Sequence, residues 1–310
     1  MIITAVSEML LATNQNALRR LHVGSQLTEE AQEVIYKLPN LSSIYVVIEG
    51  ETSLPPASLP GLTELRITCD DEDGWPGFFH GATFGKLKTV YFFPESEQIG
   101  DFLGTFKRVA LSSSIQNTLS DFRIFTPCRW NPNYSSLLPF TQLKHLEIEA
   151  SCKGGCSSRV DDELVINLSR AMPKLEVLHL GDYPCREFTT GVTAKGLVAL
   201  AHHCPNLSEL CVHFQVASLS IPLASPGTTL NTESSGLRSE CALTDFFVGG
   251  VPVAEESVSI VALTLLRIFL RIRIVIIDPT DEGWRKVEDA IHRSKQIVDF
   301  SSKQHPLITP

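Results

Sequence analysis

Apolar residues recur along this chain in a six-residue pattern, apolar-x-x-apolar-x-apolar. Five copies are clear, at residues 41–46, 62–67, 143–148, 175–180 and 207–212. Five weaker copies start at Leu18, Leu87, Leu119, Leu243 and Ile272, and successive starts lie between 21 and 36 residues apart. A repeat of this length is typical of a solenoid, in which each unit stacks on its neighbours.

Each copy ends in an alternation of apolar and polar residues, which predicts a strand with one buried face. Between several strands the apolar spacing changes to that of a helix, over residues 31–38, 197–204 and 255–269. Pro39, Pro173 and Pro205 each follow a helical pattern and precede a strand leucine by two residues. Proline cannot continue a helix, so the chain is expected to turn at these positions.

These units predict an α/β fold, a leucine-rich-repeat solenoid (horseshoe) with an inner parallel sheet, outer helices and irregular repeats. We expect residues 1–310 to form this single solenoid. Two stretches rich in proline or small polar residues, 126–139 and 214–240, are expected to be surface loops, with 214–240 the more flexible. A closing helix is expected over 281–294, because Trp284, Val287 and Ile291 give it one apolar face that can cap the stack.

The segment from Thr190 to Leu210 carries further landmarks: a threonine-rich turn, Gly196-Leu197, Leu200-Ala201 and Cys204-Pro205 before the next strand. It resembles a unit of the leucine-rich repeats of F-box proteins, and the chain as a whole is similar to fungal F-box/leucine-rich-repeat proteins. The resemblance implies that the repeats recognise a protein and recruit it to a ubiquitin ligase.

The first repeat starts at Leu18, and the residues before it are too few for the helical F-box module. We therefore expect the substrate-recognition part of an F-box type ubiquitin-ligase adaptor that lacks its F-box. One alternative is a truncated or orphan repeat protein with no ubiquitin-ligase role. Another is an enzyme that uses the solenoid as its scaffold.

Composition narrows the choice of partner and compartment. The net charge of -9, without a basic run, argues against nucleic acid or an anionic membrane as partner. The eight cysteines are scattered, and Cys204 and Cys211 fall in apolar or strand positions, which suits reduced, buried thiols. The most apolar stretch, 258–277, contains three arginines, so it is not expected to span a membrane. The expected location is cytoplasmic or nuclear.

The repeat geometry also predicts a binding surface. The residue between the last two apolar positions of each copy should point onto the concave side of the sheet. From this row we select seven candidates for a protein-binding face: Tyr45, Arg66, Tyr91, Arg123, Glu147, His179 and Phe247. Arginine and aromatic residues suit protein recognition. A solvated position in this row should tolerate substitution, so Glu147→Ala is expected to lower the free energy of unfolding by no more than about 0.5 kcal/mol.

Other motifs carry less weight. Cys152-Lys-Gly-Gly-Cys156 lacks the second ligand pair of a structural zinc site, and the acidic run 70–73 lacks the closing glutamate of a calcium loop. No phosphate-binding glycine loop or nucleophile motif is visible. We therefore expect no enzyme activity, cofactor or metal. Trp130, in a proline-rich stretch, is the best aromatic candidate for an exposed anchor.

Overall fold

The computed structural model describes the repeat strands and most of the helices between them. The residues described are 17–24, 34–35, 37–48, 59–69, 83–95, 101–113, 115–127, 132–151, 160–181, 191–219, 241–248, 252–276 and 280–304. The strands are β1 Arg20–Val23, β2 Ser43–Ile48, β3 Glu64–Cys69, β4 Thr89–Pro94, β5 Asp121–Pro127, β6 His145–Ser151, β7 Val177–Leu180, β8 Glu209–Val212, β9 Asp245–Val248 and β10 Arg273–Ile276.

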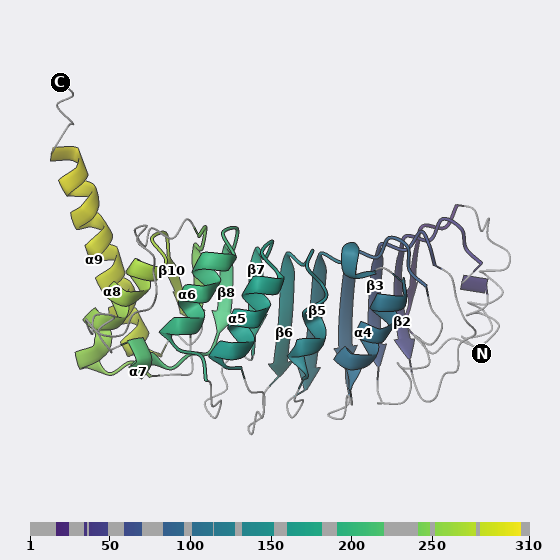
Figure 1. Ribbon diagram of the computed structural model, residues 1–310, viewed down its shortest axis with the longest axis horizontal. Coiled ribbons are helices and arrows are strands. Elements are labelled where there is room, and N and C mark those ends of the chain that lie inside the picture. The colour runs from purple at the N-terminus through teal and green to yellow at the C-terminus, as the bar shows by residue number, and fades with distance from the viewer. Residues whose placement is uncertain are drawn as a thin grey trace.

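All ten strands form one parallel sheet, and their order in the sheet is their order in the chain. Each strand is one of the ten repeat copies, so the predicted neighbouring parallel strands are confirmed. The register follows the repeat: Leu146 of β6 pairs with Leu178 of β7, and Leu178 pairs with Leu210 of β8. Figure 1 shows the strands side by side along the long axis of the molecule, a solenoid-like α/β arrangement.

The inward-facing strand residues form the core. Leu65, Val90, Phe122, Leu146 and Leu178 occupy equivalent positions in successive strands and are fully buried. Parallel strands need crossover connections, and stacking buries each strand against its neighbours and against the helices. The apolar positions of the repeat therefore specify one continuous core.

Helices cover this buried face of the sheet (Figure 1). In the described residues they are α4 Phe102–Ser113, α5 Asp162–Ala171, α6 Ala194–His203, α7 Val216–Leu219, α8 Val258–Ile268 and α9 Glu282–Gln304. The predicted helices at 197–204 and 255–269 correspond to α6 and to α8 with a preceding 3₁₀ turn, Glu255–Ser257. Of the predicted helix 31–38, the described residues show only Val34 and Ile35 in helical conformation.

The landmarks of the unit around α6 have identifiable structural roles. Thr193 is the N-cap of α6, and its hydroxyl accepts a hydrogen bond from the Lys195 amide. The Cys204 thiol lies within 3.7 Å of the carbonyl oxygens of Ser169 and Met172, at the end of the preceding helix unit. Pro205 follows and the chain turns there, as predicted.

Buried thiols recur at this position. The Cys241 thiol lies 3.5 Å from the Cys204 carbonyl oxygen, one unit further along the stack. Within the described part of the chain, Cys69, Cys204, Cys211 and Cys241 are buried, as expected for Cys204 and Cys211. Burial raises the pKa of the Cys204 thiol from 9.0 to about 12.

Phenylalanine residues replace leucine in the middle units, and α4 lies outside the helices that the sequence predicted. Phe92 of β4 stacks on Phe102 of α4 with ring centroids 3.8 Å apart. Phe106 of α4 packs between Phe122 of β5 and Phe140, at 5.0 and 5.4 Å. These aromatic contacts join three units through one helix.

Both predicted surface loops are wrong in part. Within 126–139, residues Tyr134–Leu137 form a 3₁₀ helix, and Tyr134 and Leu137 are buried. Within 214–240, Val216–Leu219 forms α7, and its two apolar ends face the core. The reason in both cases is a pair of apolar residues three positions apart, which a single helical turn brings to one side. Residues 128–131 and 220–240 lie outside the described residues.

The C-terminal helix α9 covers the predicted segment 281–294 except for Asp281, which precedes its first residue, and continues to Gln304. Trp284, Val287 and Ile291 are buried, and α9 packs against α8 and β10. In Figure 1 its C-terminal part projects beyond the end of the sheet. None of the described helices combines the length and the apolar character needed to cross a bilayer.

Candidate functional site

The sheet face opposite the helices, here called the open face, carries the candidate site. Strand pairing places the predicted residues next to one another in a single row, here called the middle row. Its members, in strand order, are His22, Tyr45, Arg66, Tyr91, Arg123, Glu147, His179, Cys211, Phe247 and Val275. All seven candidates from the sequence lie in this row.

A further set of residues on the same face was not predicted. Strands β2 to β6 continue for two or three residues beyond the repeat pattern, so the alternation brings at least one more side chain to the open face. These residues are Val47, Thr68, Phe93, Phe125 and Glu149. The signal in the sequence is the continued alternation after the last repeat leucine or isoleucine, as in Leu146-Glu-Ile148-Glu149.

Arginine and tyrosine side chains are stacked in the first half of the middle row. The Arg66 guanidinium carbon lies 4.6 Å from the ring centroid of Tyr91, and that of Arg123 lies 5.4 Å from it. Glu64 accepts a 2.7 Å hydrogen bond from Arg66 Nε. Burial raises the pKa of Tyr91, and Asp121 adds to this effect. The ring therefore stays neutral between two cations, the arrangement in which cation–π attraction operates.

Arg123 is the centre of an ionic network. Its Nε donates to Asp121 at 2.8 Å, and its Nη1 lies 3.1 Å from Glu147 Oε1. Asp121 also lies 3.4 Å from Nδ1 of His145, on the neighbouring strand. The hydrogen bond with Asp121 and the nearby carboxylates raise the pKa of Arg123, although burial opposes this. The guanidinium is thus held in one orientation by partners on two strands.

Glu147 does not lie in the solvated position that the sequence suggested. It is only 8% exposed, because Arg123 and His179 lie beside it on the two adjacent strands. Burial raises the pKa of the Glu147 carboxyl, and the attraction of Arg123 offsets this only in part. The expectation that Glu147→Ala would change the free energy of unfolding only slightly assumed that this side chain is exposed to solvent, and that assumption is wrong.

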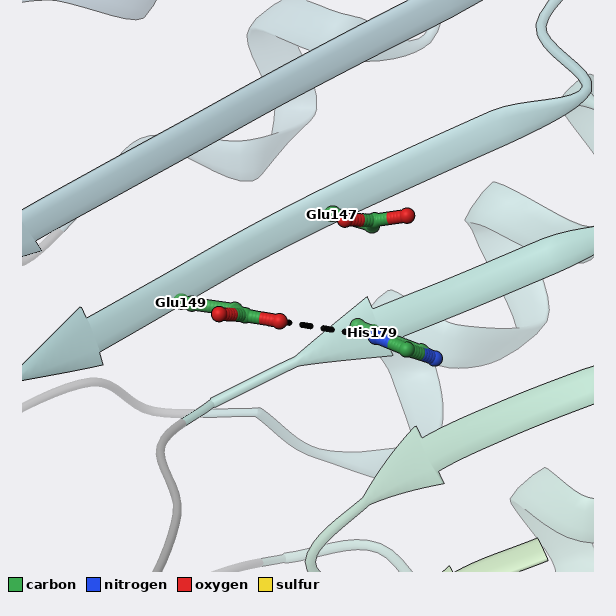
Figure 2. A group of neighbouring side chains, drawn as sticks. All are labelled: Glu147, Glu149 and His179. Carbon is green, nitrogen blue, oxygen red and sulfur yellow. Dashed lines mark ion pairs between the residues drawn. The ribbon is translucent and has the colours of Figure 1, made fainter. Parts of the chain in front are cut away.

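The second half of the middle row is more enclosed. His179 is 8% exposed, and its ring packs edge-on against Phe247 with centroids 5.4 Å apart. Cys211, between them in the row, is also buried. Within the described residues neither ring nitrogen of His179 makes a hydrogen bond. Its Nδ1 lies 3.6 Å from Glu149 Oε1 (Figure 2).

The remaining motifs from the sequence lie elsewhere. His202 and His203 at the end of α6 pack against each other, and burial lowers the pKa of His203, while the adjacent Cys204 faces α5. Trp284 is a packing residue, as predicted. The pair Cys152 and Cys156, the acidic run 70–73 and Trp130 fall outside the described residues.

Comparison with protein-family models gives no match, and comparison with curated proteins gives none either.

Proposed function

We propose that this chain is a leucine-rich-repeat scaffold of horseshoe shape that binds a protein partner on its open face. The observation that carries the proposal is the ordered stack of Arg66, Tyr91 and Arg123. Tyrosine and arginine are the residues that most often dominate binding energy in protein interfaces. Side chains already fixed before binding lose little conformational entropy when a partner docks.

The surroundings of the stack support a protein partner over nucleic acid. Each arginine in the stack has its own carboxylate, Glu64 for Arg66 and Asp121 for Arg123. A phosphate backbone would meet these carboxylates as well as the arginines, whereas a protein surface can present both signs of charge. The phenyl rings of Phe93 and Phe125, stacked at 5.2 Å beside the row, add apolar contact area.

We further propose that the scaffold is the substrate-recognition part of an F-box type ubiquitin-ligase adaptor. This rests on the resemblance of the unit around α6 to the repeats of F-box proteins. Its support is that Thr193, Gly196, Cys204 and Pro205 each have a role that a stacked repeat requires: cap, close helix contact, buried thiol and turn.

Site-specific photo-cross-linking tests the binding face. A photoreactive residue at Thr89, beside Tyr91 on the open face, should capture one protein reproducibly. The control carries the same residue at Leu111, which is 50% exposed on the helix side. If that protein were captured by the chain with the photoreactive residue at Leu111 and not by the chain with it at Thr89, the assignment of the open face as the binding surface would be contradicted.

The ligase role is tested separately on the captured partner. Deletion of the gene for this chain should lengthen the lifetime of that partner and reduce its ubiquitination. An unchanged lifetime would leave a binding scaffold without a ligase role, which is the orphan-repeat alternative.

A further inference from the structure

Two carboxylates and an imidazole converge on the open face near the middle of the sheet. Glu147 and Glu149 lie two residues apart on β6 and therefore point to the same side. His179 of β7 is the register partner of Glu147. One ligand atom from each of the three residues can be chosen so that all lie within 4.8 Å of one another (Figure 2).

His179 provides the independent sign that a ligand belongs here. Both of its ring nitrogens are buried, and neither makes a hydrogen bond with the residues that the structure describes. A buried nitrogen without a partner is costly, and such groups in native proteins usually have an explanation, for example a bound ion or water. Within the described residues, Glu149 Oε1 lies 3.6 Å from Nδ1, too far for a hydrogen bond but close to the separation of two ligands of one metal ion.

The local charge favours a cation. Two carboxylates face His179, and Arg123 is the positive side chain within ion-pair distance of Glu147. Arg123 is anchored on its far side by Asp121 through Nε at 2.8 Å and Nη2 at 3.1 Å. It can therefore keep its place while orienting the Glu147 carboxylate, the outer-shell role that often accompanies metal ligands.

We propose that Glu147, Glu149 and His179 bind one divalent transition-metal ion of the zinc class. The imidazole ligand distinguishes such a site from calcium and magnesium sites, which use oxygen ligands. Zinc bonds to nitrogen and carboxylate oxygen of about 2.0–2.2 Å place tetrahedral ligands roughly 3.3–3.6 Å apart. The His179 and Glu149 ligand atoms are already close to this separation, at 3.6 Å. Small rotations of the two glutamate side chains would bring the other ligand atoms to the same separation.

The proposal has consequences for the binding face, although it does not depend on the proposed function. Three protein ligands leave at least one coordination position of a zinc ion free for water or another donor. The ion would also be a ligand contact for the carboxylates of Glu147 and Glu149 and for one ring nitrogen of His179. The other nitrogen would stay buried in a ring that packs edge-on against Phe247.

The test uses the full chain after treatment with a chelator. Zinc is titrated by isothermal calorimetry, and bound metal is counted by mass spectrometry after dialysis. We expect one zinc ion per chain, and no displacement by millimolar magnesium or calcium. Glu149→Gln and His179→Gln should each weaken binding by at least about tenfold.

Two variants serve as controls. His145→Gln removes another histidine of the open face, whose two ring nitrogens lie 3.4 and 3.8 Å from Asp121 and Glu176, and should leave zinc binding unchanged. Cys152→Ser/Cys156→Ser removes the thiol pair in the sequence and should also leave it unchanged. X-ray absorption at the zinc edge should then show nitrogen and oxygen ligands without sulfur.

Three results would overturn the proposal. The first is that the wild-type chain binds no zinc. The second is that the double cysteine variant loses zinc binding. The third is that Glu149→Gln binds zinc as tightly as the wild-type chain. Glu149 is part-exposed, with a side chain 31% accessible, so Glu149→Gln should fold even if His179→Gln does not. The melting temperature of each metal-free variant checks this directly.

Discussion

Asp162 at the start of α5 accepts two hydrogen bonds from Thr193 at the start of the next unit's helix. The Thr193 amide donates at 2.8 Å and the Thr193 hydroxyl at 2.6 Å, and the Gly196 amide adds a third bond at 2.9 Å. One carboxylate thus satisfies two amides that the first turn of α6 leaves without helical partners. This contact fixes two neighbouring repeats relative to each other.

Loss of this carboxylate should therefore destabilise the stack. Asp162→Ala leaves two part-buried amides unsatisfied, and we expect the free energy of unfolding to fall by roughly 1–3 kcal/mol. Glu163→Gln, next to it on the exposed side of the same helix, should change it by less than about 0.5 kcal/mol. Urea denaturation of both variants measures the difference; equal losses would contradict the role of Asp162.

Gly196 is coupled to the same carboxylate. A Cβ at this position would lie 2.7 Å from Asp162 Oδ1 and 3.2 Å from Val192 Cγ1. Gly196→Ala should therefore destabilise the wild type, despite the gain of about 1 kcal/mol in helix propensity. In the Asp162→Ala background the clash with the carboxylate is gone, so the same substitution should cost less or stabilise. Additive effects in this double-mutant cycle would show that the two residues are not coupled.

Truncation of buried leucines in the core should lower the free energy of unfolding by a larger amount. Leu178 and Leu210 are fully buried on adjacent strands, and Leu→Ala at either should cost roughly 2–5 kcal/mol. The control is His22→Ala, an exposed position at the edge of the middle row, with an expected cost below about 0.5 kcal/mol. Similar losses in the three urea melts would place the leucines outside the core.

The Cys204 thiol provides a pH-dependent test. Its pKa is raised from 9.0 to about 12 by burial, so the folded chain keeps its proton where the unfolded chain loses it. This contribution to stability is complete below pH 9 and is lost as pH rises toward 12. The stability of Cys204→Ala should therefore fall less steeply than that of wild type between pH 9 and 11. Parallel curves would mean that the thiol titrates normally in the fold.

The helix α9 should protect the end of the stack. Trp284 is 1% exposed and packs edge-on against Phe214 with centroids 5.8 Å apart. Truncation after Pro279 should expose this end and cause aggregation, measured by size-exclusion chromatography. The milder Trp284→Ala should cost roughly 3–5 kcal/mol, against little for the exposed Glu288→Ala. A monomeric truncated chain with an unchanged melting temperature would show that α9 is not a cap.

The strands could be predicted because each repeats one short pattern, and the same pattern fixes their register. The helix α4 was not predicted, because no proline follows it as in other units, although Asp101 at its start accepts a hydrogen bond from the Gly104 amide at 3.1 Å. The structure places it by aromatic stacking on strands from neighbouring repeats.

The membership of the middle row also followed from the pattern, but its exposure did not. Glu147 is covered by Arg123 and His179, which are 24 and 32 residues away in the chain. Burial of this kind depends on the sizes of side chains on adjacent strands, which no single repeat contains. Glu149 was missed because it lies one residue beyond the end of the repeat.

The most direct test of the central claim is the affinity of the cross-linked partner for variants of the open face. Tyr91→Ala removes the ring between Arg66 and Arg123 and should weaken binding by at least about tenfold, as expected for a residue that dominates an interface. Arg108→Ala, an exposed change on the helix side, should leave the dissociation constant unchanged. Calorimetric titrations that give wild-type affinity for Tyr91→Ala and a loss for Arg108→Ala would contradict the account.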